Sequence, residues 1–147
     1  MGRIGGFLSV SLGDKFRLLS STILLPAVSV GIGFLSFSRV RALLLWAAAV
    51  GRPLIPGTPT PGRIVWTVEV ADDHLPGDRT CLVRSLTGEM LLCLYDFHPE
   101  HRIGVVKDAD GTVEAHSWLE HEGRILIGEL DDLTRYEPLP SLDGDAR

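Results

Sequence analysis

The spacing of apolar residues changes near residue 96, and this change constrains the fold more than any other feature of the chain. From residue 81 to 95 the apolar residues recur every three or four positions, which indicates a helix with one buried face. After residue 101 they alternate with polar residues in three short segments, which indicates strands: 102–107, 112–121 and 124–130. Tight turns at 108–111 and at Glu122-Gly123 join these strands, so the predicted sheet is antiparallel. Helices followed by an antiparallel sheet predict an α+β fold.

A proline-rich linker divides the chain. Residues 51–62, GRPLIPGTPTPG, contain four prolines. We therefore predict a helical N-terminal region with its linker over 1–59 and an α+β domain over 60–147. Thr60-Pro61 has the pattern of a helix cap followed by proline at the first helical position, whereas the apolar spacing of 62–75 fits both a helix and a strand.

The N-terminal region contains an uncharged segment, residues 18–38, that is long enough to span a membrane. Six serine or threonine residues, together with Pro26, Gly31 and Gly33, weaken its apolar character. A pair of buried helices, broken near Pro26 or near Gly31 and Gly33, is the interpretation that we favour over membrane association.

Charge and cysteine content narrow the class of protein. Residues 1–62 hold six basic residues and one acidic residue, whereas the remainder holds eight basic and eighteen acidic residues. An acidic C-terminal half argues against binding to nucleic acid, which needs a basic surface. Cys81 and Cys93 lie on one predicted helix and cannot pair without breaking it, which favours a reducing compartment and a cytoplasmic location.

Cys81 is the candidate nucleophile. It lies in the first turn of its predicted helix, after Asp78 or Thr80 as the cap, where free backbone N–H groups and the helix dipole favour a thiolate. The alternative is a small buried apolar residue, which most free cysteines are. Cys93 lies on the apolar face in mid-helix, and packing is the better interpretation for it.

His116 is the candidate base. Strand alternation places His116, Trp118 and Glu120 on one face, and a two-residue turn at Glu122-Gly123 puts His116 opposite Glu129. A cysteine, a histidine and a carboxylate form a nucleophile with its base and its orienting acid. If Gly128 marks a bulge, the register shifts by one and Asp131 or Asp132 competes for the role of the acid.

Other chemistries are poorly supported. His98 and His101 are spaced like metal ligands, but Pro99 lies between them and no third ligand is evident, so we interpret them as a loop pair. The chain contains no phosphate-binding glycine motif. We therefore predict neither a metal nor a cofactor.

Three segments together resemble a known family: LPGDRTCLVRSLTGEMLL, HRIGVV and EAHSWLEHEGRILIGELDDLTRYEPLP. Over 60–140 the chain resembles the stand-alone leader peptidases of lasso-peptide biosynthesis, which are transglutaminase-like and related in architecture to papain-type cysteine peptidases. The resemblance implies a nucleophile helix packed with an antiparallel sheet, Cys81 as nucleophile, His116 as general base and a helix over 62–75. Relatives carry an aspartate about twelve residues after the histidine, where this chain has Gly128, so Glu129 or the Asp131-Asp132 pair is expected to replace it.

The resemblance also implies a biological setting. The substrate is a ribosomally made precursor peptide with a leader and a core. A separate leader-recognition protein presents the junction to the peptidase, and an ATP-dependent cyclase similar to asparagine synthetase then closes the ring. Two alternatives remain: acyl transfer of the transglutaminase type, and a non-enzymatic scaffold associated with a membrane through residues 18–38.

Overall fold

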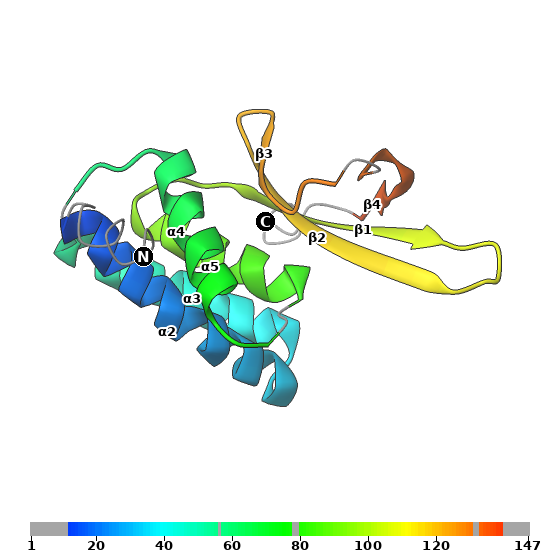
Figure 1. Cartoon of the computed structure of the whole chain (residues 1–147), viewed down its shortest axis with the longest axis horizontal. Helices are drawn as coiled ribbons and strands as arrows, with labels where there is room; N and C mark the ends of the chain where they lie inside the picture. The colour runs from blue at the N-terminus through cyan, green and yellow to red at the C-terminus, as the bar shows by residue number, and fades with distance from the viewer. Residues whose placement is uncertain (1–11, 56, 78–79, 131–132, 140–147) are drawn as a thin grey trace.

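The computed structural model describes residues 12–55, 57–77, 80–130 and 133–139, and these residues form a helical layer followed by an antiparallel sheet (Figure 1). The helices are α2 (Leu12–Phe34), α3 (Phe37–Gly51), α4 (Pro61–His74) and α5 (Cys81–Leu94). The strands are β1 (Glu100–Lys107), β2 (Val113–His121), β3 (Arg124–Ile127) and β4 (Glu137–Pro138), and short 3-10 turns occur at η1 (Arg52–Leu54) and η2 (Leu133–Arg135). The predicted α+β class is confirmed.

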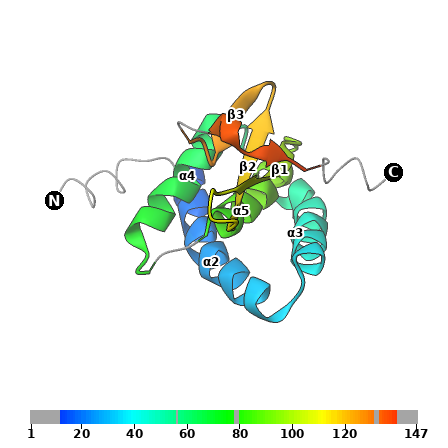
Figure 2. The ribbon, with the colours of Figure 1, turned by 90° about the vertical axis from the view of Figure 1, so that its right-hand side faces the viewer.

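The sheet has the order β3-β2-β1-β4, and each neighbouring pair is antiparallel. The four described helices lie together at one end of the sheet, and the β1–β2 ribbon extends away from them (Figures 1 and 2). Helix α5 packs most closely on the sheet, at Gly88. A methyl group on Gly88 would overlap the Ile127 side chain and lie 3.2 Å from Leu119, so this glycine lets α5 approach the strands.

Side-chain caps fix where three helices begin. The hydroxyls of Ser36, Thr60 and Thr80 accept hydrogen bonds from the backbone N–H three residues later, at distances of 3.2–3.3 Å. Thr60 resolves the ambiguous segment after it as helix α4, and Thr80 sets Cys81 as the first residue of α5. Asp78, the other candidate cap for α5, lies outside the described residues.

Helix α2 continues through Pro26, so a break at this proline is wrong. Leu25 and Val28, on either side of it, are 0% and 3% exposed in the core, and this packing outweighs the backbone hydrogen bond that proline cannot make. Helix α2 ends at Phe34 instead, close to Gly33, and Ser36 caps the start of α3.

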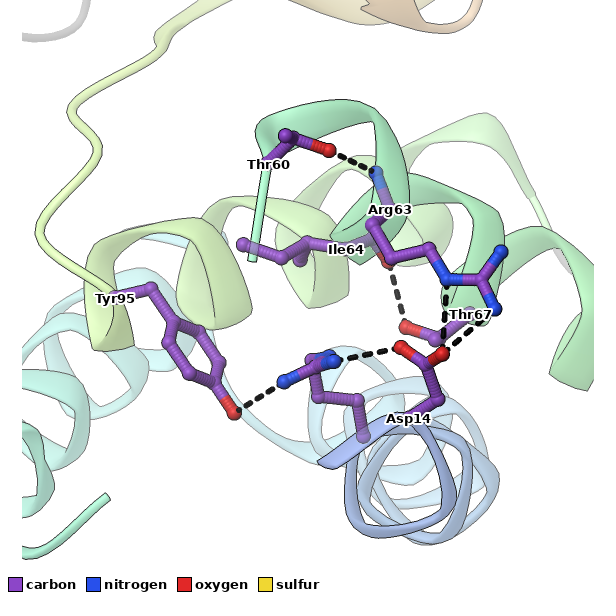
Figure 3. A network of polar contacts seen from close by, with 7 residues as sticks. Asp14, Thr60, Arg63, Ile64, Thr67 and Tyr95 are labelled. Atoms are coloured by element: carbon purple, nitrogen blue, oxygen red, sulfur yellow. Dashed lines mark hydrogen bonds and ion pairs between the residues drawn. The ribbon is translucent and has the colours of Figure 1, made fainter. Parts of the chain in front are cut away.

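A buried carboxylate, Asp14, joins α2 to α4 and, through Arg17, to the end of α5 (Figure 3). Asp14 accepts hydrogen bonds from Arg17, at 2.6 Å, and from Arg63 of α4, at 2.6 and 2.9 Å. Arg17 also donates to the Tyr95 hydroxyl at the end of α5. The hydrogen bond from Arg63 is the main reason that the pKa of Asp14 falls to about 2, against the opposing effect of burial.

The outer side of α2 is apolar. Among the described residues, α2 is the helix that is long and apolar enough to cross a membrane by length and composition. Its core-facing side is held by α4 and α5, but six large apolar side chains on its other side are exposed. We call this set the apolar stripe: Leu12, Phe16, Leu19, Ile23, Val30 and Phe34. The expected buried pair of helices is therefore buried on one side only.

Candidate active site

The predicted nucleophile, Cys81, is the first residue of α5. Its side chain is half-buried and forms no disulfide. The backbone N–H groups in the first turn of a helix have no intrahelical acceptor, so they favour negative charge on the sulfur. Cys93, twelve residues later, is buried in the core cluster, as predicted for a packing residue.

The Cys81 sulfur lies against β2. The backbone N–H of Ser117 donates a hydrogen bond to Cys81 Sγ, with an N–S distance of 3.4 Å. Ser117 directly follows His116 in the strand. The structure thus places the thiol of the helix start beside the strand segment that carries the predicted base.

His116 is 8% exposed, and its ring has a defined hydrogen-bond partner. Nε2 lies 2.5 Å from the backbone oxygen of Gly128. A carbonyl oxygen can only accept, so Nε2 carries the hydrogen and Nδ1 is the proton acceptor of the neutral ring. The rings of Trp118 and Tyr136 pack against His116 at centroid distances of 6.1 and 5.6 Å.

The predicted pairing of His116 with Glu129 is wrong. The Glu122-Gly123 turn pairs His121 with Arg124 as expected, but the register shifts by one between Glu120 and Leu119, and β3 ends at Ile127. None of the hydrogen bonds described for His116 involves Glu129, which is exposed. Asp131 and Asp132, the alternative acids, lie outside the described residues.

Gly128 cannot carry a side chain in this conformation. Its φ is +90°, and a Cβ atom there would lie 2.6 Å from the Ser117 oxygen and 2.8 Å from Trp118 Cβ. The close approach of Gly128 to β2 is what brings its carbonyl to the His116 ring. A backbone oxygen of Gly128 therefore orients the imidazole, where an acidic side chain was expected.

A buried polar chain, which the sequence did not reveal, reaches the same strand from the other face. Glu89 of α5 accepts from Arg41 of α3 at 2.7 and 3.1 Å, and from His101 Nδ1 at 2.9 Å. His101 Nε2 lies 2.6 Å from the Ser117 hydroxyl, which donates to it in the neutral ring. His101 is thus fully buried in β1, and its interpretation as part of a loop pair is wrong.

The polar chain has two consequences for the site. Burial by itself raises the pKa of Glu89, but hydrogen bonds from His101 and Arg41 outweigh it and lower the pKa below its usual value. The carboxylate is therefore ionised at neutral pH. Because Ser117 is anchored through its side chain, its N–H stays directed at the Cys81 sulfur.

A comparison with protein-family models matches residues 24–141 to the transglutaminase-like superfamily. The chain belongs to this superfamily. Transglutaminase-like proteins are typically enzymes that act through a cysteine. Searches of curated proteins and of solved structures return no match to the chain.

A pocket of about 430 Å³ lies beside the rings of Trp118 and Tyr136 that pack on His116. Its walls are mainly apolar and come from β2, β3 and the segment that leads to β4: Trp118, Ile125, Glu129, Leu130, Leu133, Thr134, Tyr136 and Pro138. Glu129 therefore lines a pocket near His116 and does not hold the ring. Within the described ranges there is no group of three residues that could hold a metal ion.

Proposed function

We propose that this chain is a cysteine peptidase that removes the leader from a ribosomally made lasso precursor peptide. The observation that carries the proposal is the position of Cys81 Sγ, at a helix start and 3.4 Å from the N–H next to His116. Membership of the transglutaminase-like superfamily supports cysteine-based chemistry. The resemblance over residues 60–140 supports leader removal as the reaction.

In the first step, the Cys81 thiolate attacks the carbonyl carbon of the scissile bond. The backbone N–H of Cys81, free at the start of α5, is the proposed donor to the resulting oxyanion. The C–N bond breaks, the His116 imidazolium gives its Nδ1 proton to the leaving core amine, and a thioester to the leader remains.

In the second step, His116 Nδ1 takes a proton from water, and the hydroxide attacks the thioester carbonyl. The bond between the acyl carbon and Cys81 Sγ breaks, which releases the leader with a free carboxylate and regenerates the Cys81 thiolate beside a protonated His116. Throughout both steps the Gly128 carbonyl keeps Nε2 protonated and the ring oriented.

The proposed partners follow from the same resemblance. The peptidase acts in the cytoplasm with a leader-recognition protein, and an asparagine-synthetase-like cyclase uses the freed core amine. Neither a metal nor a nucleotide takes part in the proposed cleavage, because a thiolate and an imidazole supply the nucleophile and the proton transfers.

Substitution of the nucleophile tests the proposal. Cys81→Ala is expected to abolish leader removal while changing the unfolding free energy by less than about 1 kcal/mol, because the side chain is only half-buried. Cys93→Ala is the matched control: it should retain cleavage and lose about 1–2 kcal/mol of stability. Mass spectrometry of the precursor, mixed with the peptidase and the recognition protein, measures cleavage. Full cleavage by Cys81→Ala would overturn the assignment.

The same spectra separate hydrolysis from acyl transfer. Hydrolysis gives a leader with a free C-terminal carboxylate, whereas transfer to an amine gives an amide conjugate of higher mass. A leader found only as the conjugate, with an added amine, would replace the peptidase by an acyltransferase that uses the same thioester.

A membrane-associated scaffold is the second candidate function, and the apolar stripe is the observation that favours it. Leu19, Ile23 and Val30 are each about 60% exposed. Partition of the chain into detergent, together with a Cys81 that does not react with iodoacetamide near neutral pH, would favour the scaffold over the enzyme.

A further inference from the structure

Strand β2 has one open edge beside the candidate nucleophile. β2 runs over nine residues, but β3 pairs only with the last three, Leu119 to His121. Residues 113–118 therefore have β1 on one side and, among the described residues, no strand on the other, although Gly128 lies against Ser117 and Trp118 at one end of this edge. Figure 1 shows the β1–β2 ribbon continuing well past the end of β3.

The backbone groups on the open edge can be assigned from the hairpin. In a two-residue hairpin the flanking residues exchange backbone hydrogen bonds, so the N–H and C=O of His121 point towards β3. Alternation then directs the same groups of Ser117, Ala115 and Val113 towards the open side. The contact of Ser117 N–H with Cys81 Sγ agrees with this assignment.

On the open side of β2, the Cys81 sulfur lies where a neighbouring strand would place a carbonyl oxygen. It lies 3.4 Å from Ser117 N, close to the position of the carbonyl oxygen that a paired strand would supply at about 2.9–3.0 Å. Further along the edge, Ala115 and Val113 are exposed, and no hydrogen bond among the described residues uses their backbone groups. A strand laid on this edge would thus run directly into the sulfur.

We infer that the open edge of β2, residues 113–115, binds an extended segment of the peptide substrate as an added strand. This inference rests on the proposed function. Backbone hydrogen bonds to Ala115 and Val113 hold the segment, and its continuation delivers a carbonyl carbon to Cys81 beside Ser117. Recognition is then of an extended main chain, with alternate backbone groups bonded to the edge.

A reactive peptide tests the pairing without altering the protein. The probe is an acetylated pentapeptide of alternating threonine and valine that ends in a chloromethyl ketone; the Cys81 thiolate displaces chloride and forms a thioether. Single N-methyl groups are placed on each amide in turn, and intact mass measures the labelling rate. Methylation of alternate amides is expected to slow labelling about fivefold to tenfold, because each removes one hydrogen bond, and the amides between them should be insensitive. Uniform sensitivity, or none, overturns the inference.

A proline on the edge gives the complementary test. Ala115→Pro removes an N–H that points to the open side, so the β1 ladder keeps its hydrogen bonds. It should slow the peptide probe about fivefold to tenfold and leave the rate with iodoacetamide, which needs no edge, within twofold. Ala109→Pro is the matched control, because Ala109 is the second residue of the turn closed by Gly111 N–H and Asp108 O, a position that accepts proline. An unchanged probe rate in Ala115→Pro counts against the strand.

The remaining outcomes also discriminate. If sedimentation shows a dimer that Ala115→Pro dissociates, the edge binds a second copy of the chain and the inference fails. If the labelling rate falls only on methylation of alternate amides but the precursor is not hydrolysed, the inference that the edge binds a strand is supported and the proposed leader removal is wrong. If hydrolysis of the precursor depends on Cys81 but the effect of N-methylation does not alternate along the probe, the proposed function is supported and the inference that the edge binds a strand is wrong.

Discussion

At the scale of single residues, the Gly128 carbonyl gives His116 an orientation without a charge. Its hydrogen bond fixes Nε2 as the protonated nitrogen and leaves Nδ1 for proton transfer. A carboxylate would do the same and would also stabilise the imidazolium formed during catalysis. The hydrogen bond described for the His116 ring goes to this neutral oxygen, whereas the helix start and the N–H of Ser117 stabilise the other partner of the ion pair, the Cys81 thiolate.

Introducing an acid at position 128 is expected to distort the site. Gly128→Asp forces a side chain into contact with Ser117 O at a φ of +90°, so the unfolding free energy should fall by about 2–3 kcal/mol and Cys81 labelling should slow. Gly123→Asp is the control, because its φ is +78° but no atom lies within 4 Å of the added Cβ. It should lose only about 1 kcal/mol by denaturant titration. Equal stability of the two variants, with faster labelling for Gly128→Asp, would mean that the acid is accommodated.

At the scale of elements, one buried polar chain holds four of them together. It runs from Arg41 on α3 through Glu89 on α5 and His101 on β1 to Ser117 on β2. A buried ion pair adds little net stability when complete, but removing one partner is costly, because the other charge is left without compensation. This buried polar chain therefore determines which faces of the two helices and the two strands meet. Its last residue, Ser117, also contacts Cys81.

The unfolding free energy is expected to depend on pH through the ionisation of Glu89. Its pKa is lowered in the folded state, so its contribution is present above the unfolded value, near 4.5, and is lost as pH falls through the lower folded value. At neutral pH, Glu89→Gln should cost about 3 kcal/mol, and the difference from the wild type should shrink as the pH falls below about 4.5. Urea titrations at several pH values measure it.

Thr87→Val provides the control on the same helix, because Thr87 is equally buried but uncharged and donates only to Val83 O. The difference between Thr87→Val and the wild type should stay constant over the same pH range. A difference for Glu89→Gln that also stays constant would show that Glu89 is not the titrating group.

At the scale of the whole molecule, local signals determined what could be predicted from the sequence. The threonine caps set the starts of α4 and α5, and the Glu122-Gly123 turn set the β2–β3 hairpin at its closed end. The sequence did not reveal the Arg41–Glu89 pair, and it offered a bulge near Gly128 only as an alternative, because both features depend on contacts between distant residues. Arg41 and Glu89 are separated by 48 positions, and the bulge that brings Gly128 to His116 exists only once β3 packs against α5 and β2.

The same local signals left residues 18–38 ambiguous between a membrane span and a buried pair of helices. In the folded chain α2 buries one side, which includes Leu25, and exposes the apolar stripe on the other. The helix therefore carries apolar side chains on both its buried and its exposed side. A row of exposed apolar side chains along a 23-residue helix is more than a soluble monomer usually presents. We therefore expect the stripe to be the main source of self-association and detergent binding by the purified chain.

Polar substitution of the stripe tests that expectation. The triple variant Leu19→Gln, Ile23→Gln and Val30→Gln should keep the unfolding free energy within about 0.5 kcal/mol per site, because these side chains are already about 60% exposed. It should also lower light scattering and detergent uptake, because less apolar surface is left in water. Leu25→Gln is the control on the buried side of α2 and should lose more than about 3 kcal/mol, because it places an amide without partners in the core. If the triple variant unfolds as readily as Leu25→Gln, the stripe is packed in solution; if its detergent uptake is unchanged, the association comes from another surface.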